Sequence, residues 1–159
     1  MNFNTINFHA GELLRLIQPD ALKRPEPIDL VALLMTCADS LGLNVECAPS
    51  CALGDIEGFY EPKRQLIALR EDVWTALHER CAATHRARST FAHELSHWNL
   101  DGISMDGDDA WAHAGCLMMP CEMVQSLEVI DDVTVSRVFD VSPQFAYKHL
   151  WRMKKARLL

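Results

Sequence analysis

The sequence has no run of about 18 consecutive apolar residues, the length that a transmembrane helix needs, so we expect no membrane span. It also lacks a basic N-terminal region followed by an apolar stretch and a cleavage site, so we expect no secretion signal and a cytoplasmic protein. Basic residues are not in excess: 15 lysines and arginines against 22 acidic residues leave a net charge of −7. This balance argues against a general binder of nucleic acid or of membrane surfaces.

Paired cysteines are scarce as well. None of the six cysteines forms a Cys-x-x-Cys pair, and no second pair completes the four-residue spacing of Cys47 and Cys51 into a zinc-ribbon or zinc-finger pattern. In a reducing compartment we expect most of them to be small buried hydrophobic residues. No local feature marks any of them as an activated nucleophile. The remaining four are Cys37, Cys81, Cys116 and Cys121.

What is present fits one globular domain. The 159 residues are 49% hydrophobic and 23% charged, which is typical of a single soluble domain with a core of its own. Residues 1–27 are interpreted as a loosely attached N-terminal extension, with a short helix at 11–18, because three prolines in PDALKRPEP break regular structure. Residues 28–159 are expected to form the main domain.

The pattern along that domain predicts mostly helices and a few strands. Residues 28–41 have helical spacing and end at Gly42, a typical helix stop. A strand is expected at 43–47, and strands at 56–60 and 65–69 should form a hairpin through Glu61–Arg64. We therefore predict an α+β fold with a small antiparallel sheet packed on a helical body. Further helices are expected at 71–80, 84–100, 109–118, 120–129, 132–139 and 143–158.

The segment RSTFAHELSHWNL contains the sequence His-Glu-x-x-His within the helix expected at 84–100. Residues four apart lie on one face of a helix, so His93 and His97 can both bind Zn²⁺. Glu94 is rotated by about 100° from His93, so it can take a proton from a zinc-activated water without binding the metal. Chance would produce this pattern in about one chain in fifty of this composition. The pattern therefore indicates a zinc hydrolase, with the active-site helix running along the sheet.

The third ligand is not fixed by the motif. The long metzincin pattern needs a glycine at Leu100 and a histidine at Ile103, so it is excluded. The candidates that remain all follow the motif in the sequence. Two of them, Asp109 and His113, are four residues apart and so share one face of the next expected helix. These candidates are Asp101, Asp106, Asp108, Asp109 and His113.

Four blocks in order resemble the ImmA/IrrE family of metallopeptidases, over about residues 28–153. They are IEGFY with QLIAL, then RSTFAHELSHWNL, DDAWAHAGCLMMP and VSRVFDVSPQFAYKHLWRM. The resemblance implies a zincin-like fold, Zn²⁺ as the cofactor, His93 and His97 as ligands, and Glu94 as the catalytic residue. It implies Asp109 as the third ligand, where the family has glutamate, one methylene longer.

Two departures from the family leave details of the site open. Trp111 stands where the family has asparagine, and His113 stands where it has phenylalanine. His113 is therefore kept as an alternative ligand or as a donor to the oxyanion of the reaction. His85 is a weaker candidate for that donor and is interpreted as a surface residue at a helix start. Tyr60, at the end of the hairpin, could point into the cleft.

The function that the resemblance implies is limited, site-specific proteolysis of a regulatory protein. The partner would be a DNA-binding repressor of the helix-turn-helix type, controlling a phage, a mobile element or a stress regulon in a bacterium. An alternative is a zinc-containing regulator that binds a repressor or antitoxin without cutting it. Glu94 argues against this alternative, because a purely structural site needs no carboxylate at that position.

A second alternative is DNA binding through the C-terminal helices. Residues 132–158 have the rhythm of a helix-turn-helix, and the second helix of this pair is basic. We favour a solvated basic face, with Trp151 packed into the core and no direct role in binding nucleic acid. The basic residues are Lys148, Arg152, Lys154, Lys155 and Arg157.

Overall fold

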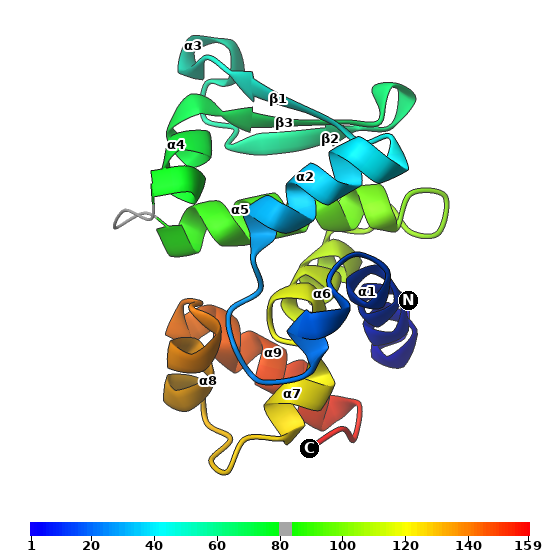
Figure 1. Cartoon of the computed structure of the whole chain (residues 1–159), viewed down its shortest axis with the longest axis vertical. Coiled ribbons are helices and arrows are strands. Elements are labelled where there is room, and N and C mark those ends of the chain that lie inside the picture. The colour runs from blue at the N-terminus through cyan, green and yellow to red at the C-terminus, as the bar shows by residue number, and fades with distance from the viewer. Residues whose placement is uncertain (80–83) are drawn as a thin grey trace.

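The computed structural model describes residues 1–79 and 84–159 (Figure 1). Its strands are β1 (Asn44–Ala48), β2 (Gly58–Glu61) and β3 (Leu66–Arg70). Its α-helices are α1 (Phe3–Ile17), α2 (Leu30–Leu41), α3 (Ser50–Leu53), α4 (Glu71–Glu79), α5 (Thr84–Asn99), α6 (Gly107–Met118), α7 (Cys121–Gln125), α8 (Asp132–Phe139) and α9 (Pro143–Lys155). Short 3₁₀ helices, η1 (Pro19–Leu22) and η2 (Pro62–Arg64), complete the set.

The three strands form one sheet in the order β1-β3-β2. The predicted hairpin is confirmed: β2 and β3 are antiparallel, with Gly58 opposite Leu69, and η2 joins them. The prediction of an antiparallel sheet is wrong, because β1 runs parallel to β3, with Asn44 opposite Leu66. The chain between β1 and β3 contains α3 and β2, so it reverses direction and brings β3 back alongside β1 in the same sense. The α+β class stands, with a mixed sheet.

Helix α2 shows how local chemistry sets the ends of an element. Asp29 caps its first turn, where its carboxylate accepts a hydrogen bond from the backbone N–H of Ala32 at 3.0 Å. Gly42 ends it in the left-handed region, with φ of +75°. The predicted stop at Gly42 is confirmed, and the helix starts at Leu30 rather than at residue 28.

The elements stack in layers (Figure 1). Helix α5 packs across the sheet against β2 and β3, as predicted for the motif helix. Helix α6 packs against α5 on the side away from the sheet, and α9 packs against α6 and α8. The large buried side chains Phe91, Leu95, Leu117 and Phe139 connect these layers into one core.

The N-terminal segment is part of this core, so the expectation of a loose extension is wrong. The helix expected at 11–18 is the second half of a 15-residue helix, α1, which packs along α6. Its apolar stripe of Ile6, Ala10, Leu13 and Leu14 is 5% exposed or less. Residues at this spacing lie on one face of a helix, and burying that face holds the segment against the domain.

Several predicted bounds need correction. The helix expected at 120–129 is the five-residue α7, and the one expected at 143–158 ends at Lys155. The short helix α3 lies between the first two strands, where no helix was expected. Helix α6 begins two residues earlier than predicted, because the Asp106 carboxylate caps it at the Asp108 N–H. Residue 80, the expected end of the helix at 71–80, lies outside the described residues.

In the described ranges, 1–79 and 84–159, no helix combines the length and the apolar character needed to cross a membrane.

Candidate functional site

The two motif histidines lie side by side on α5. Their ring centroids are 4.7 Å apart and their planes are inclined at 78°. The Nδ1 atom of each ring is buried and has no hydrogen-bond partner among the described residues. Burial, with the neighbouring His97 charge, lowers the pKa of His93 to about 4, and burial also lowers the pKa of His97. Both imidazoles are therefore held neutral, the form that binds a metal ion.

Glu94 lies on the adjacent face of α5 and turns toward the sheet. Its side chain is buried, with 8% of the residue exposed. Burial raises the pKa of the carboxyl to about 7, although a hydrogen bond from the backbone N–H of Tyr60 partly offsets this rise. A carboxyl that titrates near neutral pH is suited to accept and return a proton.

The close approach of α5 to β2 depends on Gly58. A Cβ atom at this position would lie 2.8 Å from the Cδ2 atom of Leu69 and 3.4 Å from the Cγ atom of Glu94. Only a residue without a side chain lets the strand come this near to the helix. The hairpin thus positions the candidate catalytic carboxylate.

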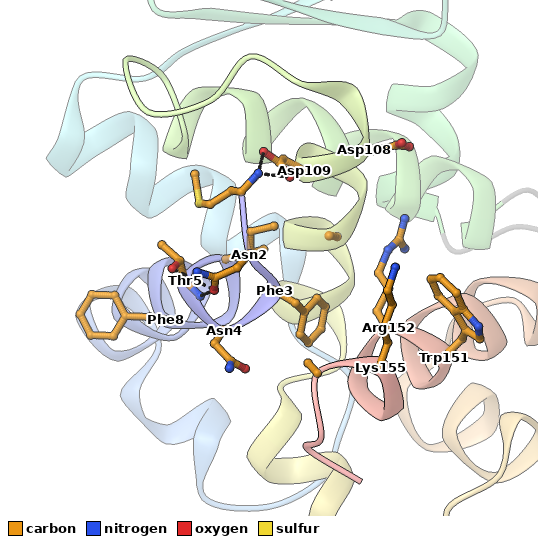
Figure 2. A pocket seen from close by; sticks show the side chains of 14 residues that line it. Asn2, Phe3, Asn4, Thr5, Phe8, Asp108, Asp109, Trp151, Arg152 and Lys155 are labelled. Carbon is orange, nitrogen blue, oxygen red and sulfur yellow. Dashed lines mark hydrogen bonds and ion pairs between the residues drawn. The ribbon is translucent and has the colours of Figure 1, made fainter.

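Asp109 sits near the start of α6 and is already bound by other groups (Figure 2). Its carboxylate accepts hydrogen bonds from the Met1 ammonium at 2.8 and 3.0 Å, and from the Ser104 hydroxyl at 2.7 Å. Burial alone would raise the pKa of Asp109, but these contacts lower it overall. Within the described residues, no three His, Cys, Asp or Glu side chains are arranged to hold a metal ion. Asp109 as third ligand stays a prediction.

His113 uses both of its ring nitrogens to bind α5. Ser96 donates its hydroxyl proton to the Ala92 carbonyl at 2.6 Å, so this hydroxyl accepts from the His113 Nδ1–H at 2.9 Å. The Nε2 atom then accepts from the Asn99 amide at 2.9 Å. Burial lowers the pKa of His113 to about 3. These bonds join α6 to α5 through a neutral imidazole, and a role as ligand would require breaking them.

Trp111 is a further residue of the site, and its position next to His93 was not expected from the sequence. Its indole stacks on the His93 imidazole, with ring centroids 4.1 Å apart and planes inclined at 19°. It also meets Phe145 of α9 edge-on at 6.1 Å. Its place two positions after Asp109, where the resembled family has asparagine, was the signal that the sequence offered.

The other candidates have roles away from the two histidines. The Tyr60 hydroxyl donates to Asp101 at 2.9 Å and accepts from the Gln65 amide at 2.7 Å. Burial and the Asp101 carboxylate raise the pKa of Tyr60 to about 12. Asp101 therefore anchors the hairpin through Tyr60. His85 is exposed and bonded to Asp140 at 2.9 Å, which fits its interpretation as a surface residue.

A groove of about 1010 Å³ opens beside Asp109, between α1 and α9 (Figure 2). Phe3 and Phe8 line it from α1, and Trp151, Arg152 and Lys155 from α9. A smaller cavity of about 240 Å³ adjoins it. Asp108 and Arg152 line both cavities, and Ser89, Trp111, Phe145 and Lys148 line the second one. The two cavities thus extend from α1 to the indole that covers His93.

The expected inward packing of Trp151 is wrong. This residue is 53% exposed, and the Lys155 ammonium lies 5.1 Å from the centre of its ring. Ala146, Leu150 and Met153 form the buried stripe of α9 instead, and helical geometry then turns position 151 outward. The exposed indole and the basic side chains near it belong to the wall of the groove.

Comparison with known proteins adds no assignment: no family model, no curated protein and no solved structure matches this chain.

Proposed function

We propose that the chain is a zinc-dependent endopeptidase that makes limited cuts in a regulatory protein. The observation that supports this most directly is the pair formed by His93 and His97, with adjacent imidazoles and buried, unpartnered Nδ1 atoms. Glu94 follows the first of them and is held against the hairpin. This is the residue set that a His-Glu-x-x-His hydrolase uses to bind zinc and to move a proton.

The two imidazoles fit a metal ion, and the third ligand would be the Asp109 carboxylate, which would exchange its contacts with Met1 and Ser104 for the metal. A bound Zn²⁺ would supply a Lewis acid that brings the pKa of water down toward about 7. Glu94 would accept the proton of the attacking water and deliver it to the leaving amine. The raised pKa of Glu94 supports both transfers near neutral pH.

The proposed substrate is a protein chain, by resemblance a helix-turn-helix repressor. The two adjoining cavities offer room for an extended segment, with aromatic side chains and both signs of charge along their walls. Asp108 and Arg152, at the point where the cavities meet, would bind charged side chains of that segment. Such pairing selects a sequence and so favours cleavage at one site.

The test measures metal content and cleavage separately. Purified protein loaded with one equivalent of zinc and passed through a desalting column should retain stoichiometric metal, and His93→Ala or His97→Ala should lose it. Incubation with repressors encoded beside its own gene should give one fixed product. Glu94→Gln should keep the metal and lose cleavage, while Glu79→Gln, a change on the exposed face of α4, should keep both. Wild-type protein that holds no zinc would overturn the proposal.

One observation favours a second function, that of a non-catalytic regulator. Asp109 is engaged by Met1 and Ser104, and the described residues offer the two histidines no third ligand in this arrangement. In this case the groove would bind a repressor or antitoxin without cutting it. Stable complex formation with no cleavage, equal in wild type and in Glu94→Gln, would favour this function.

A further inference from the structure

Two cysteines meet where α6 ends and α7 begins. Cys116 lies in the last turn of α6, and Cys121 is the first residue of α7, after a break at Pro120. They are 1% and 3% exposed. Both side chains line one small cavity, and the Cys116 thiol is close enough to hydrogen-bond to the Cys121 sulfur. The break between the two helices thus brings together two sulfur atoms that are five residues apart in the sequence.

A buried imidazole from α9 completes the cluster. The Nε2 atom of His149 lies 4.0 Å from the Cys121 sulfur, and its Nδ1 atom is buried with no hydrogen-bond partner among the described residues. A Cβ atom on Gly115 would lie 2.7 Å from that Nδ1 atom, so the ring is held tightly against α6. A protonated Nε2 directed at sulfur stabilises the thiolate form.

The cluster can be reached from solvent. A cavity of about 110 Å³ is lined by both cysteines together with Arg15, Pro120 and Glu122. It has room for a molecule as small as hydrogen peroxide. Cys37, by contrast, is fully buried and lines none of the described cavities, and Cys47 and Cys51 are exposed on the surface.

We propose that Cys116 and Cys121 form a peroxide-sensitive dithiol that closes to a disulfide, with Cys121 as the sulfur that reacts first and His149 as the residue that positions and activates it. The inference does not depend on the proposed peptidase activity, since none of the three residues belongs to the candidate metal site.

The reaction balances with one peroxide. The Cys121 thiolate attacks one peroxide oxygen, the O–O bond breaks, and the departing hydroxide takes a proton to become water, leaving a sulfenic acid on Cys121. The Cys116 sulfur then attacks the sulfenic sulfur, the S–O bond breaks, and the hydroxide leaves with the Cys116 proton as a second water. Two thiols are oxidised, and the peroxide is reduced to two waters.

The electrostatics of the pair agree with this order. The hydrogen bond from Cys116 lowers the pKa of Cys121 below its usual range, against the effect of burial, with His149 adding to the shift. Burial raises the pKa of Cys116, with the bond to Cys121 adding to the rise and Arg152 opposing it. Cys121 is therefore the better thiolate and Cys116 the resolving thiol.

The test uses the distribution of tryptic sites. The chain has no lysine or arginine between Arg88 and Arg137, so one peptide, residues 89–137, carries Cys116 and Cys121 and none of the other four cysteines. Full-length reduced protein in EDTA would be treated with hydrogen peroxide, blocked with N-ethylmaleimide and digested. We expect this peptide to lose both labels together, to be lighter by about 2 Da than the unlabelled dithiol, and to regain both labels after reduction.

Variants separate the roles. In Cys116→Ser the sulfenic acid should persist at Cys121 and be trapped by dimedone, and in Cys121→Ser the peptide should keep its remaining label. His149→Gln should slow closure about tenfold, while Cys47→Ser should leave it unchanged. The proposal is overturned if the wild-type peptide keeps both labels while surface cysteines react, or if Cys121 passes to the sulfinic acid without forming the disulfide.

Discussion

The imidazole of His93 lies flat against the indole of Trp111, with ring centroids 4.1 Å apart and planes inclined at 19°. His93 belongs to α5 and Trp111 to α6, so the stack links the helix that carries the motif to the helix that carries Asp109. It also covers one face of a candidate ligand. A metal ion binds a ring nitrogen in the plane of the imidazole, so the stack fixes the direction in which His93 can offer that nitrogen.

Replacing Trp111 tests the role of this stacking contact. In Trp111→Asn we expect tighter zinc binding, because the His93 ring can then turn its nitrogen toward the ion. We also expect a loss of about 0.5–1.5 kcal/mol of unfolding free energy in EDTA, the usual worth of an aromatic pair. Isothermal titration with zinc and urea denaturation measure the two effects. Trp151→Asn, a change to an exposed indole of the groove, is the matched control and should leave zinc affinity unchanged.

The length of the side chain at position 109 should control the affinity for zinc. Asp109→Glu adds one methylene and should tighten zinc binding, because the carboxylate reaches farther across the gap from α6 to α5. Asp109→Asn removes the charge and should weaken binding by about tenfold or more. Competition with a fluorescent chelator measures both. If the two variants bind zinc as the wild type does, the third ligand is another residue.

The approach of the hairpin to α5 should not tolerate a methyl group at position 58. Gly58→Ala places a Cβ atom 2.8 Å from the Leu69 side chain. The strand must shift, which should cost about 1–3 kcal/mol of unfolding free energy and move Glu94 from its place. Gly107→Ala is the control, since no atom of the described residues lies within 4 Å of a Cβ there. Chemical denaturation of both variants gives the comparison, and equal stabilities would contradict the crowding at Gly58.

Acid should destabilise the protein through His113. Its pKa is about 3 in the folded chain and about 6.5 in the unfolded chain, so the unfolded state binds the proton first. This contribution to stability is complete above pH 6.5 and is lost as the pH falls toward 3, by at most about 1.4 kcal/mol per pH unit. Urea midpoints in EDTA between pH 7 and pH 4 measure the slope. His113→Gln should lessen the slope and leave the part that His93 contributes, whereas the exposed control His78→Gln should leave it unchanged.

The elements with strong local signals were predictable. Helix α2 follows from its periodicity between Asp29 and Gly42, and the hairpin follows from two apolar segments around Pro62. Helix α8 was predicted to the residue, because Asp131 caps its start and the chain turns into the left-handed region at Asp140. In each case the determinants lie within a few residues of the element.

Features that depend on distant contacts were not predictable. The parallel pairing of β1 with β3 depends on the path of the intervening chain, and the packing of α1 on α6 joins the first helix to one a hundred residues later. The candidate site divides in the same way. The helical spacing placed His93 beside His97, whereas the partners of Asp109, His113 and Trp111 come from tertiary packing.

Helix α6 packs against α5 on one side and against α1 on another, so it is a central helix enclosed by segments from both halves of the chain. The segments that carry the motif and its neighbouring candidate residues begin after α1, but the folding unit does not. A chain shortened to start at residue 28 would keep every residue of those segments and yet expose one face of α6 to water. The segment that carries the motifs therefore needs α1 as well in order to fold around them.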